Sequence, residues 1–222
     1  KAMYSGGLVL EPQVGLYDDF VMMLDFNSLY PSVIQEYNIC FTTVERPNED
    51  QVAQFNSEAE LLAATEQPDS SDAEGVLPLV LRRLVESRRQ VKTEIKSTRD
   101  PRRLQRLEIR QKALKLTANS MYGCLGFQFS RFHARPLAAL VTKMGRQALE
   151  STINIVKHEL VLDVVYGDTD SVFVNSKTKD FAAAMQVAEQ IKRAVNKKYK
   201  RLEIEIDGVF GKLLLLKKKK YA

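Results

Sequence analysis

The tetrapeptide Gly167-Asp168-Thr169-Asp170 constrains the fold most strongly, because apolar runs at 161–166 and 171–174 flank it. Two short apolar runs joined by a polar turn predict a β-hairpin, and its tip would carry two carboxylates. A third carboxylate, Asp25, ends another strand-like run. Aspartates at the ends of separate strands can converge, and such oxygen ligands suit Mg²⁺. The pattern favours a two-metal phosphoryl-transfer site, although aspartate is also common in ordinary turns.

The charge of the chain is unevenly distributed. Residues 47–76 contain eight acidic residues and no Lys or Arg, whereas the rest of the chain carries 33 basic and 20 acidic residues. A basic body favours a polyanionic partner, most simply nucleic acid, although basic residues also solvate ordinary helix faces. The polar composition of the acidic stretch predicts a loop or a partly disordered, flexible insertion.

Composition argues against several other classes of protein. No apolar run approaches the roughly 20 residues of a membrane-spanning helix, so no membrane is expected as a partner. Cys40 and Cys124 lie far apart and neither belongs to a CxxC pair, which favours neither a zinc site nor a disulfide framework. His133 and His158 are isolated, and we interpret both as structural or surface residues.

Hydrophobic spacing predicts the order of the secondary-structure elements. Helical periodicity appears twice within 77–126, on either side of the turn signal at 97–101, and predicts an antiparallel helical hairpin. The other expected elements are strands at about 20–26, 161–166, 171–175, 202–206 and 209–216, and helices at 28–36, after Pro136 and at 180–199. Without the hairpin the order is β-α-β-β-α-β plus one strand, a ferredoxin-like arrangement that would bring Asp25 to the 167–170 turn.

The helical hairpin carries side chains that suit a triphosphate. Arg88 and Lys92 are four residues apart, as are Lys115 and Asn119, with Tyr122 one turn further along. Each group therefore lies on one helix face. Arg binds phosphate oxygens in bidentate fashion and Lys acts as a point charge. Basic residues on amphipathic helices are common, however, so any one of them taken alone favours a solvated surface.

Two further segments suit nucleotides or nucleic acid. At the change from strand to helix, the backbone N–H groups of Ser28, Leu29 and Tyr30 could hold phosphate oxygens, and the Tyr30 ring could form the floor of a sugar pocket. Tyr30 could equally cap the core. The leucines at 213–216 run into the lysines at 217–220, which could follow a nucleic-acid backbone or simply be solvated.

Together these motifs resemble those of the family B DNA polymerases. The segments DFNSLYPS (25–32), KLTANSMYG (115–123) and YGDTDS (166–171) are similar to motifs A, B and C of that family, in order and at suitable spacing. KKKY (218–221) resembles the KKxY motif that contacts the primer, and Tyr4-Ser5-Gly6-Gly7 resembles the YxGG segment that contacts the template. The resemblance covers nearly the whole chain, and three long motifs in order are highly specific.

The resemblance implies roles for particular residues. The catalytic acids would be Asp25, Asp168 and Asp170; Asp25, Asp170 and the Phe26 carbonyl would bind two Mg²⁺ ions, with Asp168 as a supporting acid. The incoming nucleotide would be bound by Ser28, Leu29, Tyr30, Arg88, Lys92, Lys115 and Asn119, with Tyr30 excluding a ribose 2′-OH. DNA would contact Tyr4, Gly6, Gly7, Tyr122, Gly123, Lys219 and Tyr221. Glu203 is a weaker candidate for a third carboxylate near the metals.

The implied fold class is α+β, a ferredoxin-like βαββαβ palm with an inserted antiparallel two-helix fingers hairpin. The palm would comprise residues 1–46 and 127–222, the acidic insertion 47–76 and the fingers 77–126. The implied enzyme is a nuclear, replicative DNA-directed DNA polymerase that adds dNTPs to the 3′-OH of an RNA–DNA primer on a DNA template, with primase and accessory subunits as partners. We expect the isolated segment to be poorly active or inactive, because the family's thumb follows the KKxY strand.

Two other functions share the expected sheet. A nucleotidyl cyclase also places paired acids on a ferredoxin-like sheet, but it needs neither the Lys115–Tyr122 helix face nor a basic tail. An RNA-recognition module would present aromatic residues on its central strands, where this chain has Asp25, Asp168 and Asp170.

Overall fold

The computed structural model describes residues 4–69 and 71–222, which form two compact units. The helical unit contains Tyr4 and Val33–Val141, and the sheet unit contains Ser5–Ser32 and Thr142–Ala222. The division passes through two helices, α1 (Leu29–Glu36) and α6 (Arg135–Asn154). The combination of helices with antiparallel sheets is compatible with the expected α+β class.

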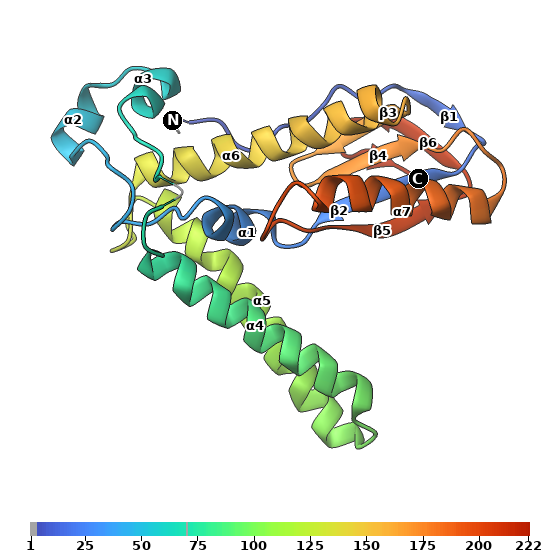
Figure 1. Cartoon of the computed structure of the whole chain (residues 1–222), viewed down its shortest axis with the longest axis horizontal. Coiled ribbons are helices and arrows are strands. Elements are labelled where there is room, and N and C mark those ends of the chain that lie inside the picture. The colour runs from blue at the N-terminus through green and yellow to red at the C-terminus, as the bar shows by residue number, and fades with distance from the viewer. Residues whose placement is uncertain (1–3, 70) are drawn as a thin grey trace. The chain divides into compact units, whose positions relative to one another are not determined.

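A four-stranded antiparallel sheet forms the centre of the sheet unit (Figure 1). Its strands are β2 (Val21–Phe26), β3 (Asp163–Asp168), β4 (Ser171–Asn175) and β5 (Ile204–Phe210). They lie in the order β3-β4-β2-β5, so β2 is an inner strand between two strands from much later in the chain. This burial suits its sequence, VMMLDF, in which Val21, Met22, Leu24 and Phe26 are buried.

A helix and a second sheet complete the core of this unit. Helix α7 (Phe181–Asn196) packs on β2 and β5 through residues at helical spacing, namely Ala184, Ala188, Ile191 and Val195. The second sheet contains β1 (Gly15–Tyr17), β6 (Leu213–Lys217) and β7 (Lys220–Tyr221) in the order β1-β6-β7. Leu213 and Leu215 of β6 join Tyr166 and Phe173 in one hydrophobic cluster. A short π-helix, η1 (Ile155–Glu159), follows α6.

Two long helices in the helical unit, α4 (Val76–Ser97) and α5 (Pro101–Gly126), lie where the sequence predicts a hairpin and run antiparallel (Figure 1). The turn is well specified, because the Asp100 side chain accepts a hydrogen bond from the Arg102 N–H and Pro101 takes the first helical position. In the described part of the chain, no helix is both long and apolar enough to span a membrane.

The acidic segment differs from the loop that its composition predicts. It contains α2 (Glu49–Gln54) and α3 (Glu58–Ala63), two short helices in the helical unit. Asn48 and Gln51 form a reciprocal capping box at the start of α2, and Ser57 caps α3. Each helix also buries one apolar residue, Val52 or Leu61, beside Ala139. Good capping and one buried contact per helix therefore outweigh the low overall hydrophobicity.

Other strand boundaries also differ from the expectation. The strands expected at 202–206 and 209–216 are β5 and β6, with the turn between them moved to residues 211–212. β5 continues through Gly208, because its pairing with β2 extends to Val21. The short strands β1 and β7 were not predicted, since three and two residues carry no clear alternation.

We predict that Asn196→Ala destabilises the sheet unit by about 1–3 kcal/mol. The Asn196 side chain ends α7 with two hydrogen bonds to one residue of β5: it donates to the Ile204 carbonyl at 3.1 Å and accepts from the Ile204 N–H at 2.7 Å. Asn196→Asp keeps the acceptor and should lose less. Urea unfolding of the variants measures this, and equal losses for both would contradict a contribution from the accepted bond.

Candidate active site

Strand register places acidic residues in one row across the sheet. Asp168 lies opposite Ser171, Ser171 opposite Asp25, and Asp25 opposite Glu205. Residues directly opposite in antiparallel strands project from the same face, so this row crosses all four strands on one face. The Phe26 N–H also donates to the Asp170 carbonyl at 2.8 Å. The structure thus brings Asp25 to the turn that carries the other two aspartates.

Glu205, which sequence reasoning missed, lies opposite Asp25, whereas the predicted third acid, Glu203, precedes β5. The Glu203 carbonyl instead accepts a hydrogen bond from the Asn27 N–H at 2.9 Å. The two glutamates are two residues apart in an alternating stretch, so both fit the same face of a strand. Only the register between β2 and β5 distinguishes them, and no local sequence signal contains it.

The turn between β3 and β4 is tight and strained. Thr169 has φ of 60°, a conformation that β-branched residues rarely adopt, and the Asp170 N–H donates to the Asp168 carbonyl at 2.6 Å. This is a γ-turn, an arrangement that costs energy and persists only where its surroundings hold it.

Residues 7–10 hold the turn in this strained form. The Thr169 N–H donates to the Leu8 carbonyl at 2.7 Å, and Val9 forms a bridge with Asp168. A Cβ on Gly7 would lie 2.6 Å from the Thr169 side chain, so only glycine permits this approach. The predicted template-binding residue Gly7 therefore also has a structural role at the turn.

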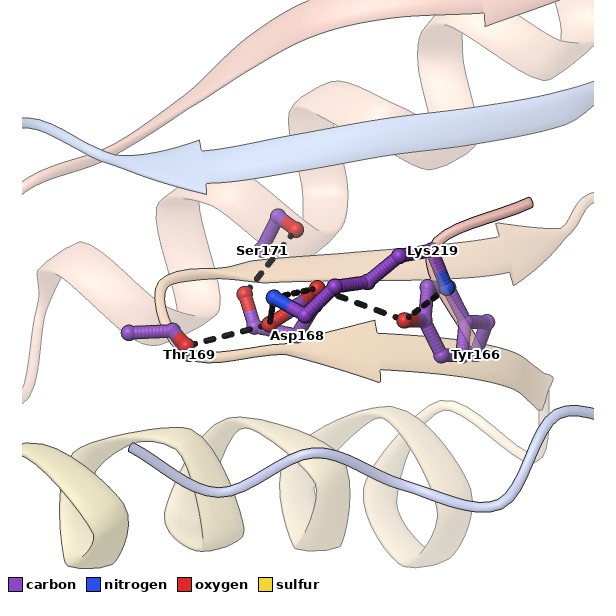
Figure 2. Close-up of polar contacts among 5 residues, drawn as sticks. All are labelled: Tyr166, Asp168, Thr169, Ser171 and Lys219. Carbon is purple, nitrogen blue, oxygen red and sulfur yellow. Dashed lines mark hydrogen bonds and ion pairs between the residues drawn. The ribbon is translucent and has the colours of Figure 1, made fainter. Parts of the chain in front are cut away.

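The Asp168 carboxylate is surrounded by donors from the protein itself (Figure 2). Lys219 Nζ lies 3.0 Å from Oδ1 and 2.8 Å from Oδ2. The Thr169 hydroxyl donates to Oδ1 at 3.0 Å, and the Tyr166 hydroxyl donates to Oδ2 at 3.3 Å. Tyr166 in turn accepts from the Lys219 N–H at 2.9 Å. Asp168 is thus an ion-paired carboxylate, and the predicted DNA-binding residue Lys219 is its partner.

Burial and these contacts shift the pKa values of Asp168, Lys219 and Tyr166. Burial raises the pKa of Asp168, but hydrogen bonds from Lys219 and Thr169 outweigh it and leave this pKa below its ordinary value. The hydrogen bond and charge of Asp168 raise the pKa of Lys219. Burial raises the pKa of Tyr166. At neutral pH the site therefore contains a carboxylate, an ammonium group and a protonated phenol.

The other two aspartates, Asp25 and Asp170, suit a divalent cation that a substrate would bind at the same time. Among the described residues, no three acidic, His or Cys side chains are grouped closely enough to hold a metal ion. Asp25 and Asp170 nevertheless offer carboxylate oxygens, and Phe26 a carbonyl oxygen, near the point where β2 meets the turn between β3 and β4. Mg²⁺ is typically bound by one or two carboxylates together with substrate phosphates and water, so this donor set fits it.

The predicted nucleotide-binding segment after β2 lies in the sheet unit. Ser28 has φ of 48° and α1 begins at Leu29, so the backbone N–H groups of Ser28, Leu29 and Tyr30 lie at the N-terminus of this helix. A Cβ on Gly145 of α6 would lie 3.3 Å from Cε1 of the Tyr30 ring. Gly145, which sequence reasoning missed, therefore lets this ring lie close to α6.

Other candidate residues belong to the helical unit. Arg88 of α4 donates to the Gln111 side chain of α5 at 3.4 Å, which ties the two helices together. The other candidate triphosphate ligands, Lys92, Lys115 and Asn119, have exposed side chains. The triphosphate candidates on α4 and α5 and the carboxylates thus belong to different compact units.

The predicted DNA-binding residues are divided in the same way. Burial raises the pKa of Tyr4, partly offset by a hydrogen bond with Tyr122, so these two meet in the helical unit. In the sheet unit, the Gly6 carbonyl accepts from Arg146 at 3.0 Å. The Tyr221 ring packs on Phe173 with centroids 5.0 Å apart.

Comparison with known proteins gives one consistent result. The chain is 55% identical to the DNA polymerase alpha catalytic subunit of Drosophila melanogaster and 54% identical to that of Mus musculus, each over 224 residues, and 51% identical to that of Sterkiella nova over 235 residues. Each comparison covers the whole chain but only 14–16% of the relative. The model of DNA polymerase family B matches residues 1–222. The chain therefore belongs to DNA polymerase family B.

Proposed function

We propose that this chain forms the catalytic core of a nuclear, replicative DNA polymerase of the alpha type. The reaction is template-directed transfer of a dNTP onto a primer 3′-OH, with release of pyrophosphate. The observation that carries the proposal is the meeting of Asp25 with the Asp168–Ser171 turn at one edge of the sheet. Family membership favours this function over a nucleotidyl cyclase or an RNA-recognition module.

The proposed architecture is a palm with inserted fingers. The strand order β3-β4-β2-β5, with helices between β2 and β3 and between β4 and β5, supports a ferredoxin-like palm from residues 1–46 and 127–222. The α4–α5 hairpin supports fingers at 77–126, and residues 47–76 form an insertion between the two. Primase and accessory subunits are the partners expected for this type of polymerase.

The acids supply the metal ligands in this proposal. Asp25, Asp170 and the Phe26 carbonyl would hold two Mg²⁺ ions. When bound, these ions lower the pKa of the primer 3′-OH and neutralise charge on the triphosphate. Asp168 is a supporting acid and not a metal ligand in this proposal, because Lys219 already balances its charge.

The remaining candidates bind and orient the substrates. Arg88, Lys92 and Lys115 bind the triphosphate, Asn119 lies beside the nascent pair, and the N–H groups of Ser28–Tyr30 bind phosphate oxygens. Tyr30 excludes a ribose 2′-OH. Tyr4, Gly6 and Gly7 contact the template, Tyr122 and Gly123 pack on the nascent base pair, and Lys219 and Tyr221 contact an RNA–DNA primer. The Lys219 side chain is 67% exposed, which leaves its amine within reach of a phosphate.

Asp25→Asn or Asp170→Asn in the full-length enzyme should lower the rate of nucleotide addition by several orders of magnitude, because each removes a metal-binding charge. Single-turnover extension of a labelled primer measures the rate. Asp163→Asn is the matched control: it removes an exposed carboxylate at the far end of β3, where Asp163 pairs with Lys177. Near-normal turnover of either site variant would refute the metal assignment.

Tyr30→Val should raise the ribonucleotide-to-deoxyribonucleotide ratio of kcat/KM by about tenfold or more, because the lost ring makes room for the 2′-OH. Gly145→Ala should also change the ratio, since its methyl group would displace the ring. Competition between matched ribo- and deoxyribonucleotides gives the ratio directly. An unchanged ratio in Tyr30→Val would leave this tyrosine with a packing role only.

Gly123→Ala separates folding from binding. Apart from its chain neighbours and the nearby backbone of its own helix, no atom of the described residues lies within 4 Å of a Cβ built at Gly123, and alanine favours a helix over glycine by about 0.5–1 kcal/mol. We therefore expect the thermal unfolding temperature to stay equal or rise while affinity for primer-template falls. Unaltered affinity at two salt concentrations would show that this helix position does not face nucleic acid.

A further inference from the structure

The C-terminal turn between β6 and β7 docks on the turn that carries the acids. We infer that Lys219 is a positioning residue for the reaction: by holding Asp168 it fixes the Asp168–Ser171 turn and so keeps Asp170 beside Asp25. This inference rests on the proposed function and assigns Lys219 a role besides contact with the primer.

Lys219 contacts the turn and the end of β3 through two different groups, its amine and its backbone N–H. Its amine reaches both oxygens of Asp168, and its backbone N–H donates to the Tyr166 hydroxyl, which itself donates to Asp168 (Figure 2). The Tyr166 ring is buried and packs on Phe173 with centroids 5.5 Å apart, so this hydroxyl is a fixed anchor. The backbone hydrogen bond and the side-chain ion pair together define the position of Lys219 far better than either would alone.

The backbone of both turns is adapted to this contact. Lys219 has φ of 61° and Thr169 has φ of 60°, so each turn has a non-glycine residue in the left-handed region. Such residues persist where the surrounding structure determines them. Lys217 pairs with Lys220, so Lys218 and Lys219 form the tip of a tight hairpin that presents Lys219 to Asp168.

Charge gives Lys219 its effect on the reaction. Asp168 lies in the same row as Asp25 and two residues before Asp170. Without the ammonium group, Asp168 would add an unbalanced negative charge to a site that already gathers two carboxylates, and like charges repel strongly where they are partly buried. Asp168 would then move away or compete for a cation, and either outcome displaces Asp170.

The decisive test is rescue of one variant by another. In the full-length enzyme, Lys219→Met should lower the single-turnover addition rate on the order of tenfold at saturating primer-template and dNTP. Adding Asp168→Asn removes the unbalanced charge, although not the loss of the ion pair, and should restore part of that rate. Lys219→Arg keeps a cation beside Asp168 and should lose less of the rate than Lys219→Met. Lys212→Met, which removes an exposed lysine paired with Asp18 on the same unit, is the control.

Two further measurements separate positioning from contact with the primer. Binding of Mn²⁺, followed by electron paramagnetic resonance without nucleotide, should change in Lys219→Met, because Asp168 is then unbalanced, and should return towards that of the unaltered enzyme in the double variant. Tyr166→Phe, which removes only the bridging hydroxyl, should lower the rate in the same direction by about threefold. This last variant also carries the test if Lys219→Met does not fold.

The opposite results would overturn the inference. If Lys219→Met weakens only primer-template affinity and its salt dependence, with a normal saturated rate, Lys219 acts on nucleic acid alone. Additive losses in the double variant would lead to the same conclusion. If the unaltered enzyme adds no nucleotide to a primer, the proposed function fails and this inference fails with it. A normal unaltered enzyme with no rescue refutes the inference alone.

Discussion

The antiparallel pairing of β2 with β4 is the constraint on which the candidate site depends. It sets Asp25 opposite Ser171 and allows the Phe26 N–H to bind the Asp170 carbonyl, so two distant motifs meet at one sheet edge. A slip of one residue would turn Asp25 into the core and bring Leu24 out, which burial of Leu24 and Phe26 forbids. Hydrophobic burial along β2 thus fixes the position of a charged group that contributes nothing to that burial.

An ion pair within the protein, rather than solvent alone, balances part of the negative charge in the site. One of the three aspartates is balanced within the protein by Lys219, and hydroxyl groups satisfy its remaining acceptors. The backbone carbonyl of Asp170 accepts a hydrogen bond from the N–H of Phe26, the residue after Asp25. In the proposed function, a carboxylate that is already ion-paired within the protein is a weaker metal ligand, so Asp168 is better suited to supporting the turn than to binding a cation.

The sequence was most informative where the signal is local. Apolar runs around Gly167–Asp170 predicted the hairpin, and helical periodicity predicted α4 and α5, because these patterns reflect neighbouring residues. Long-range contacts were not predictable: Glu205 faces Asp25 through register, Gly7 matters because Thr169 approaches it, and Lys219 pairs with an acid in another sheet. The prediction of a loop in the acidic segment was wrong because amino-acid composition reflects polarity but not the capping interactions that stabilise α2 and α3.

The pairing of Lys219 with Asp168 has a consequence for how the chain is synthesised. Asp168 is synthesised 51 residues before Lys219, and Asp25 precedes both of them by many more residues. A ribosome-bound chain that has reached β5 already contains every aspartate of the site, yet Asp168 has no ammonium partner and its turn lacks one of its supports. Domains fold largely as units as they emerge, so Asp168 gains its ammonium partner only after the segment that follows β6 has been made.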